Sequence, residues 1–442
     1  MIPAALQHAA FRRLFGAQLI ALTGTGLATV ALGLLALQLA GDSAGVVLGT
    51  ALAIKMTTYV FLSPLAAALA ERLPRRSFLI GLDLIRATVM LCLPFVDQLW
   101  QIYVLIFLLQ AASAGFTPAF QAVIPDVLQN DRSYTSALSL MRIAEDAEQI
   151  ISPLLAVLLL GFVGFPDLFI GTAIGFACSA WLIAVTPIAA KSRPTDANFW
   201  GRARTGVQIY TLTPRLRGLL ALEAAVAAAG AMVFVNTASL AAQLAPQDTG
   251  RAIALAMGAF GAGSIAAAAF APSLRRFADR WVMISGAAIM TLGLICLPWM
   301  TAHLWAVMLI WAVMGAGFSL NQTPIGRVLT QSCTQDDRTA TFAAQFALSH
   351  LFWLFTYPLA GLLGAAVGLQ ITALILAGIA LVGLFAGALL WPAQDIAILA
   401  HDHADLPPDH PHLAQHIGPA AHGHVFVIDV LHPRWPNSAG RL

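Results

Sequence analysis

The stretch MRIAEDAEQIISPLLA, residues 141–156, places charged side chains on a long apolar run that ends near Phe162. At about 100° per residue, its polar side chains fall within about 160° of arc, forming one face of a helix. These side chains are Arg142, Glu145, Asp146, Glu148, Gln149 and Ser152. Glu148 lies about 21 Å and Asp146 about 24 Å from the far surface of an apolar layer about 30 Å thick. Ionisable groups at that depth predict an ion or substrate route.

Composition indicates a polytopic membrane protein. The 442 residues are 59% hydrophobic and 10% charged, whereas soluble domains carry about 25% charged residues. The lipid bilayer is therefore the expected partner. The net charge is +2, and no basic cluster is interleaved with aromatic residues, so we expect no nucleic-acid partner.

Apolar stretches long enough to span a membrane occur twelve times. They lie near residues 14–40, 45–70, 78–96, 101–123, 136–162, 166–188, 216–244, 250–273, 281–299, 302–325, 339–365 and 368–392. Lys and Arg concentrate in alternate loops, while the opposite loops hold only Arg251. By the positive-inside rule, both termini are expected to be cytoplasmic.

The spans divide into two equal sets. Residues 1–188 and 215–392 are each expected to form a six-helix half, joined by a basic cytoplasmic linker at residues 189–214. After Pro392 the hydrophobicity stops, and residues 393–442 form a cytoplasmic His-rich tail.

The loop after the second span carries a recognisable motif. The major facilitator superfamily has G-x-x-x-D-R-x-G-R-R there, and this chain has the following residues: Ala67, Glu71, Arg72, Pro74, Arg75 and Arg76. Both glycines are replaced, but the chain resembles that family. The resemblance implies an all-α membrane protein with twelve transmembrane helices in two pseudo-symmetric halves. It also implies a gating role for Glu71, Arg72, Arg75 and Arg76.

Two other family patterns are weaker. In the second half, residues 274–281 (LRRFADRW) form a degenerate copy with Arg275 in place of the acid. The Gly-Pro pair of proton-antiporting exporters falls at Ser152 and Pro153, so only the proline is kept.

Further charges lie inside other spans. Lys55 is about 15 Å into the second span and needs a counter-charge. Asp83 and Arg86 are spaced to pair with each other on one helix face. Glu223, about 9 Å into its span, is expected to be structural.

In the second half the candidates are Gln345 and His350, the latter about 18 Å into its span. Two interpretations remain open: a static ion-pair network, or a proton and substrate pathway. The candidate pathway residues are Lys55, Asp83, Arg86, Arg142, Glu145, Asp146, Glu148, Gln345 and His350.

Histidines are concentrated in the tail, which holds eight of the eleven in the chain. Imidazoles interleaved with carboxylates suit nickel, cobalt, zinc or copper(II), although a flexible polar tail with chance histidines is the simpler alternative. The predicted metal ligands are His401, His403, His410, His412, His416, His422 and His424. The following segment, residues 425–431, is a candidate docking strand.

Several stretches together resemble the nickel-resistance (NreB-type) exporters, including ALSLMRIAEDAEQIISPLLA, FAAQFALSHLFWLFTYPLAG and the tail ending VIDVLHPRWP. The resemblance implies a secondary exporter of a bacterial inner membrane that works by alternating access, and we expect a monomer. Together with the His-rich tail it predicts proton-coupled efflux of nickel or cobalt. Efflux of an amphipathic organic compound (drug, siderophore or lipid-like) and a non-transporting metal sensor are the alternatives. No enzyme motif is present, and no cofactor is expected; a divalent metal is the cargo or tail ligand.

Overall fold

The computed structural model describes residues 3–40, 44–188, 199–393, 398–401, 422–429 and 431–436. Six long helices form the N-terminal half, the N-half: α1 (Ala9–Ala40), α2 (Ala44–Arg72), α3 (Arg75–Cys92), α4 (Leu99–Val127), α5 (Asp131–Leu160) and α6 (Phe165–Ala184). Another six form the C-half: α8 (Pro214–Leu244), α9 (Thr249–Phe270), α10 (Asp279–Met300), α11 (Leu304–Gln322), α13 (Arg338–Val367) and α14 (Leu369–Leu390). The shorter helices are α7 (Phe199–Leu212) and α12 (Ile325–Thr330), with 3-10 turns at Ala4–Gln7, Leu93–Phe95 and Ala271–Arg276.

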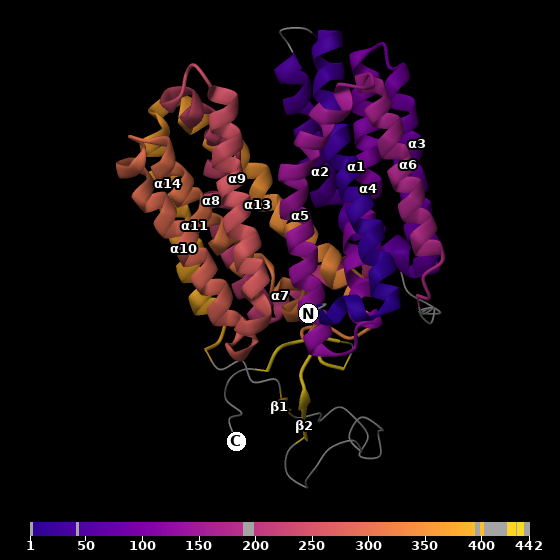
Figure 1. Cartoon of the computed structure of the whole chain (residues 1–442). Coiled ribbons are helices and arrows are strands. Elements are labelled where there is room, and N and C mark those ends of the chain that lie inside the picture. Colours follow the sequence, from indigo (N-terminus) through magenta and orange to yellow (C-terminus); the bar gives the residue numbers. More distant parts are fainter. Residues whose placement is uncertain are drawn as a thin grey trace.

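The predicted fold class is confirmed. Among the described residues, eleven helices are long and apolar enough to cross a membrane. The twelfth long helix, α5, has 30 residues and carries the charged stretch at residues 141–156. Its charges lower its hydropathy, but α5 stands within the N-half among the other long helices (Figure 1).

The two halves repeat one packing pattern. In the N-half α1 packs on α6 and α2 on α4, and in the C-half α8 packs on α14 and α9 on α11. The halves meet where α2 faces α13 and α5 faces α9, and we call this contact the seam. Figure 1 shows the halves side by side, diverging away from the end at which α1 begins. We call that end, where α14 also finishes, the terminal end.

Small residues let the helices within a half approach closely. A Cβ added at Gly263 of α9 would lie 1.8 Å from the carbonyl oxygen of Ala312, and one at Gly315 of α11 would lie 1.9 Å from that of Phe260. The two backbones are therefore in direct contact at two levels. Such contacts stabilise helix pairs in lipid, where burial of apolar side chains provides no net drive.

Large apolar side chains remain exposed on several helices, as expected for a surface that faces lipid. Trp181 of α6 is 63% exposed, Leu292 of α10 57% and Val382 of α14 71%. In water such a surface would be unfavourable, whereas lipid tails are as apolar as these side chains.

Proline divides the predicted tenth span. The helix α11 ends at Gln322, and α12 begins at Ile325 directly after Pro324. Proline lacks an N–H group and its ring disfavours the preceding helical turn, so the chain bends at this point.

Part of the tail packs against the C-half. Strands β1 (Ile398–His401) and β2 (His422–Val425) pair antiparallel, with His401 opposite His422. Phe426 and Ile428 follow β2 and join the C-half core, and Trp435 lies 5.8 Å below the Arg215 guanidinium. The docking segment is thus only partly a strand. His403, His410, His412 and His416 lie outside the described residues.

Replacing Gly263 or Gly315 with valine is expected to lower the thermal unfolding midpoint of detergent-purified protein by several degrees, because α9 and α11 must separate. Gly258→Val is the matched control on α9, since a Cβ there meets nothing within 4 Å. Equal midpoints for all three variants would contradict this role for the contact.

Candidate substrate pathway and gate

The polar face of α5 points toward both α1 and the C-half. Arg142 donates to Glu145 at 3.0 Å, and its guanidinium lies 4.9 Å from the ring of Phe318 in α11. The Glu145 side chain is 34% exposed. Arg142 therefore bridges the two halves near the middle of the bundle, while the neighbouring carboxylate stays accessible. The side chain of Asp146 lies outside the described part of the structure.

Glu148 lies where α5 touches α1. A Cβ added at Gly26 would lie 2.4 Å from Oε1 of Glu148 and 2.1 Å from the Cβ of Ser152. Only glycine allows α1 to pass this close, so Gly26 positions the carboxylate. Gly26 could not be recognised from the sequence, because its role depends on neighbours more than a hundred residues away in the chain.

Lys55 of α2 completes a charged cluster around Glu148, which it attracts. Its ammonium group lies 5.7 Å from the ring of Tyr59, one turn along α2. Tyr59 in turn contacts the rings of Phe346 and His350 in α13 at 4.7 and 5.0 Å. Lys55, Tyr59, Glu145, Glu148 and His350 form what we call the central cluster. It joins helices of both halves at the seam.

The ring of His350 is oriented by its own helix. Nδ1 lies 2.7 Å from the carbonyl oxygen of Phe346, so this nitrogen donates and carries the proton of the neutral ring. The other ring nitrogen, Nε2, is then an acceptor or a metal ligand.

Asp83 and Arg86 lie inside the N-half, away from the seam. Asp83 pairs with Arg86 and accepts a hydrogen bond from Ser179 of α6 at 2.8 Å. The guanidinium lies between the rings of Phe116 and Phe176, at 3.9 and 4.5 Å. For this pair the static, structural interpretation is the better supported one.

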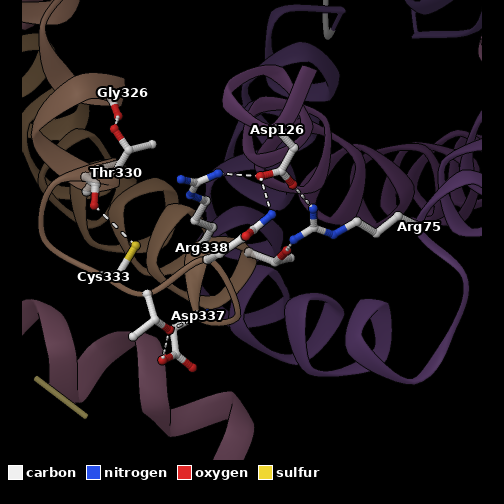
Figure 2. A network of polar contacts seen from close by, with 11 residues as sticks. Arg75, Asp126, Gly326, Thr330, Cys333, Asp337 and Arg338 are labelled. Atoms are coloured by element: carbon white, nitrogen blue, oxygen red, sulfur yellow. Dashed lines mark hydrogen bonds and ion pairs between the residues drawn. The ribbon is translucent and has the colours of Figure 1, made fainter. Parts of the chain in front are cut away.

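At the terminal end, Asp126 of α4 ties the halves together. It pairs with Arg75, the first residue of α3, and with Arg338, the first residue of α13 (Figure 2). Gln335 donates to the same carboxylate at 3.4 Å, and Arg75 reaches Thr339 at 3.4 Å. We call Arg75, Asp126 and Arg338 the first latch.

The predicted gating motif contributes unequally to this network. Arg75 is buried within it, whereas Arg72 and Arg76 are exposed and the Glu71 side chain lies outside the described part of the structure. Asp126 and Arg338 were missed by the sequence analysis. Both lie at predicted span ends, where charges are common, so no local signal distinguished them.

Charged groups of the C-half also reach the seam. Arg327 of α12 pairs with Asp279 through two hydrogen bonds, and its third nitrogen donates to Thr135 of α5 at 3.1 Å. Beside it, a Cβ added at Gly326 would lie 2.8 Å from both Tyr134 and Leu138 of α5. The halves therefore touch closely here.

Gln345 is bound to the linker rather than facing the central cluster. It accepts a hydrogen bond from the hydroxyl of Tyr210 in α7. Burial raises the pKa of Tyr210 well above its usual value, and Glu223 adds to the shift, so the hydroxyl remains a donor. Glu223, 2% exposed, accepts from Gln322 at 2.9 Å, as a structural group would.

The cross-half hydrogen bonds described here lie between the terminal end and the middle of the bundle. Ser63, the innermost, donates to the carbonyl oxygen of Ala343 at 3.3 Å. Toward the opposite end the halves diverge (Figure 1). The structure is thus closed at the terminal end.

Comparison with a family model identifies the chain. Residues 14–222 and 274–410 match the Major Facilitator Superfamily. The chain belongs to this superfamily. It is therefore a membrane transporter and not an enzyme, and a small molecule or ion is its substrate. None of the curated proteins compared matches the chain.

Solved structures of transporters share the fold. The human organic anion transporter MFSD10 (TETRAN) is 13% identical, with TM-score 0.71, over 88% of this chain and 100% of that one. A bacterial homologue of the iron transporter ferroportin, in an outward-facing state, is 14% identical, with TM-score 0.71, over 86% and 98%. The E. coli fucose:proton symporter FucP is 15% identical, with TM-score 0.65, over 86% and 98%.

Gly26→Ala is expected to impair transport at least several-fold, because its methyl group would force α1 away from Glu148 and Ser152. Gly33→Ala, on the same helix, is the matched control because a Cβ there meets nothing within 4 Å. Uptake of substrate into vesicles holding equal amounts of each variant measures the effect. Equal uptake by the two variants would show that the close approach is irrelevant.

Asp126→Asn is expected to open the terminal end, because Arg75 and Arg338 lose the carboxylate that both contact. Cys333, 6% exposed, is the reporter once the exposed Cys92, Cys178 and Cys296 are replaced by serine. Its rate of labelling by a polar maleimide should rise several-fold.

The control is Asp248→Asn, which removes an exposed acid at the opposite end, 3.8 Å from Arg251. Its labelling rate should match that of the parent protein. A first-latch variant that also labels at the parental rate would contradict the role of Asp126 in closure.

Proposed function

We propose that the protein is a secondary active exporter that works by alternating access and couples efflux to proton entry. The terminal end then faces the cytoplasm of a bacterium, and the membrane is the inner membrane. The loops at that end hold most of the Arg and Lys residues, including Arg72, Arg75 and Arg76, and this bias supports the orientation. In the state described, the substrate site would be open to the outside.

The central cluster is the observation that carries this proposal. In this cluster, Lys55 of the N-half interacts electrostatically with Glu148 of its own half and with His350 of the C-half. Glu145 acts on Glu148, and Tyr59 contacts the His350 ring. When the halves rock about the seam, the distance between His350 and the N-half charges must change. Such groups bind protons differently in the two states, which is what coupling requires.

We further propose a divalent transition metal, nickel or cobalt, as the cargo. The His-rich tail supports capture from the cytoplasm, and Glu145, Glu148 and Nε2 of His350 are suitable transient ligands. The described residues contain no group of three or more His, Cys, Asp or Glu side chains arranged around one metal position. A weak site is consistent with export, because a transported ion must leave quickly.

A second candidate is an amphipathic organic anion. Lys55 and Arg142 supply positive charge at the seam, and the rings of Tyr59, Phe318 and Phe346 supply apolar surface. The similarity to the MFSD10 organic anion transporter points the same way at the level of the fold alone.

The two candidates are distinguished by flux in vesicles holding the purified full chain. We expect nickel or cobalt to move faster with an imposed proton gradient than without one. Combined replacement of Glu145, Asp146 and Glu148 by their amides should abolish the gradient effect, because the proton acceptors are gone. A variant with the seven tail histidines changed to glutamine retains the docked segment from Phe426 onward and should lower the apparent affinity only.

Matched controls exclude a general loss of fold. Asp97→Asn changes an exposed acid outside the central cluster and should leave flux unchanged. Unaltered gradient dependence in the triple variant would contradict coupling through α5. Gradient-driven movement of organic anions without metal movement would favour the second candidate, and metal binding without any flux would leave a sensor.

A further inference from the structure

The repeated packing pattern relates each helix of the N-half to one of the C-half. The pairs α1 with α6, α2 with α4 and α3 with α6 correspond to α8 with α14, α9 with α11 and α10 with α14. By the same relation α5 corresponds to α13, since each packs on the first helix of its half and crosses the seam. Residues at equivalent positions can therefore be compared.

At the terminal end, charged residues occupy equivalent positions in the two halves, but their charges have opposite signs. Arg75 begins α3, and Asp279 begins the equivalent α10. Asp126 lies in the last turn of α4, and Arg327 lies in α12, which continues α11. The remaining pair is Arg338 at the start of α13 and Asp131 at the start of α5.

The contacts are also equivalent. Asp126 binds Arg75 within its own half and Arg338 across the seam. Arg327 binds Asp279 within its own half and donates across the seam to Thr135, one turn after Asp131. Asp131 also attracts Arg327 electrostatically. The Arg327 and Asp279 side chains are only 15% and 13% exposed, so water screens these charges weakly.

The two attractions between charges across the seam have the same polarity. The N-half presents the carboxylates of Asp126 and Asp131, and the C-half presents the guanidinium groups of Arg338 and Arg327. The two attractions therefore act together to hold the terminal end closed. When the halves separate, Asp126 remains paired with Arg75 and Arg327 remains paired with Asp279. Neither Asp126 nor Arg327 is then left buried and unpaired.

We propose that Asp279, Arg327 and Asp131 form a second latch, the charge-inverted counterpart of the first, with Arg327 as its positioning residue. It closes the terminal end by holding α5 against the C-half. The inversion explains why a search for the motif in residues 274–281 finds an arginine in place of the acid. The acid of this half lies further along, at Asp279, and occupies the position of Arg75.

The two latches hold two of the three helices that contribute to the central cluster. The first latch contacts the start of α13, which bears His350, and the second contacts the start of α5, which bears Glu145 and Glu148. Each latch therefore fixes one side of the central cluster while the terminal end is closed.

A charge exchange within the C-half tests the second latch. Asp279→Arg together with Arg327→Asp preserves the pair inside the half but places a negative charge opposite Asp131. A small cavity lined by Thr135, Ser319 and Thr323 adjoins Arg327 on the side that faces α5. Adding Asp131→Arg should then restore the attraction.

The readout is the distance between spin labels at Gln129 and Ala278, two exposed positions on opposite sides of the seam at the terminal end. The four native cysteines are first replaced by serine in the full chain. We expect the exchange to lower the ratio of closed to open molecules about ten-fold, because like charges then face each other. The triple variant should return the ratio to that of the parent.

An unchanged distance distribution after the exchange would overturn the proposal. So would a folded triple variant that stays open, because a merely structural role for Asp279 and Arg327 predicts no rescue through α5.

A milder variant covers the case in which the exchange prevents folding. Asp131→Arg alone alters an exposed residue, leaves the C-half intact and should also favour the open form. Its control is Asp97→Arg, the same change of charge at an exposed site near the opposite end. Equal distributions for these two variants would likewise overturn the second latch.

Discussion

The cost of an unpaired charge in a medium of low dielectric constant governs this structure. Asp83 and Arg86 avoid this cost in every state, because their partners lie within one half. Asp126 and Arg327 each have two partners, one inside their own half and one across the seam. That double arrangement allows the halves to separate without stranding a buried charge.

Close helix packing makes each half stiff enough to move as one body when the halves separate. Backbone contacts at Gly263 and Gly315 leave α9 and α11 no room to slide independently. The seam is different, because its contacts depend on side chains that can release, such as Tyr59 against His350 and Arg142 against Phe318. Motion is therefore expected at the seam rather than inside a half.

Helix α5 carries both a contact with the C-half at the terminal end and charged residues near the middle of the bundle. Its first turns contact the C-half through Thr135, and its middle carries Arg142, Glu145 and Glu148. In the proposed mechanism, a change in charge at these carboxylates acts on the same helix that holds the terminal end closed. In the C-half, α13 combines Arg338 and His350 in the same way.

The sequence by itself determined the membrane class, the long helices, the two halves and the family, because hydrophobic length and charge are local properties that lipid reads directly. It also identified the polar face of α5 and singled out Arg75, which the structure pairs with Asp126. Only the tertiary structure decided the partners: Gly26 for Glu148, Ser179 for Asp83, Tyr210 for Gln345 and Asp126 for Arg338. These contacts join residues far apart in the chain, and the hydropathy of a segment does not indicate which other helix it will face. The inverted charges of the C-half could not be recognised from the sequence for the same reason. The role of a charge depends on its partner, and the partner is known only from the tertiary structure.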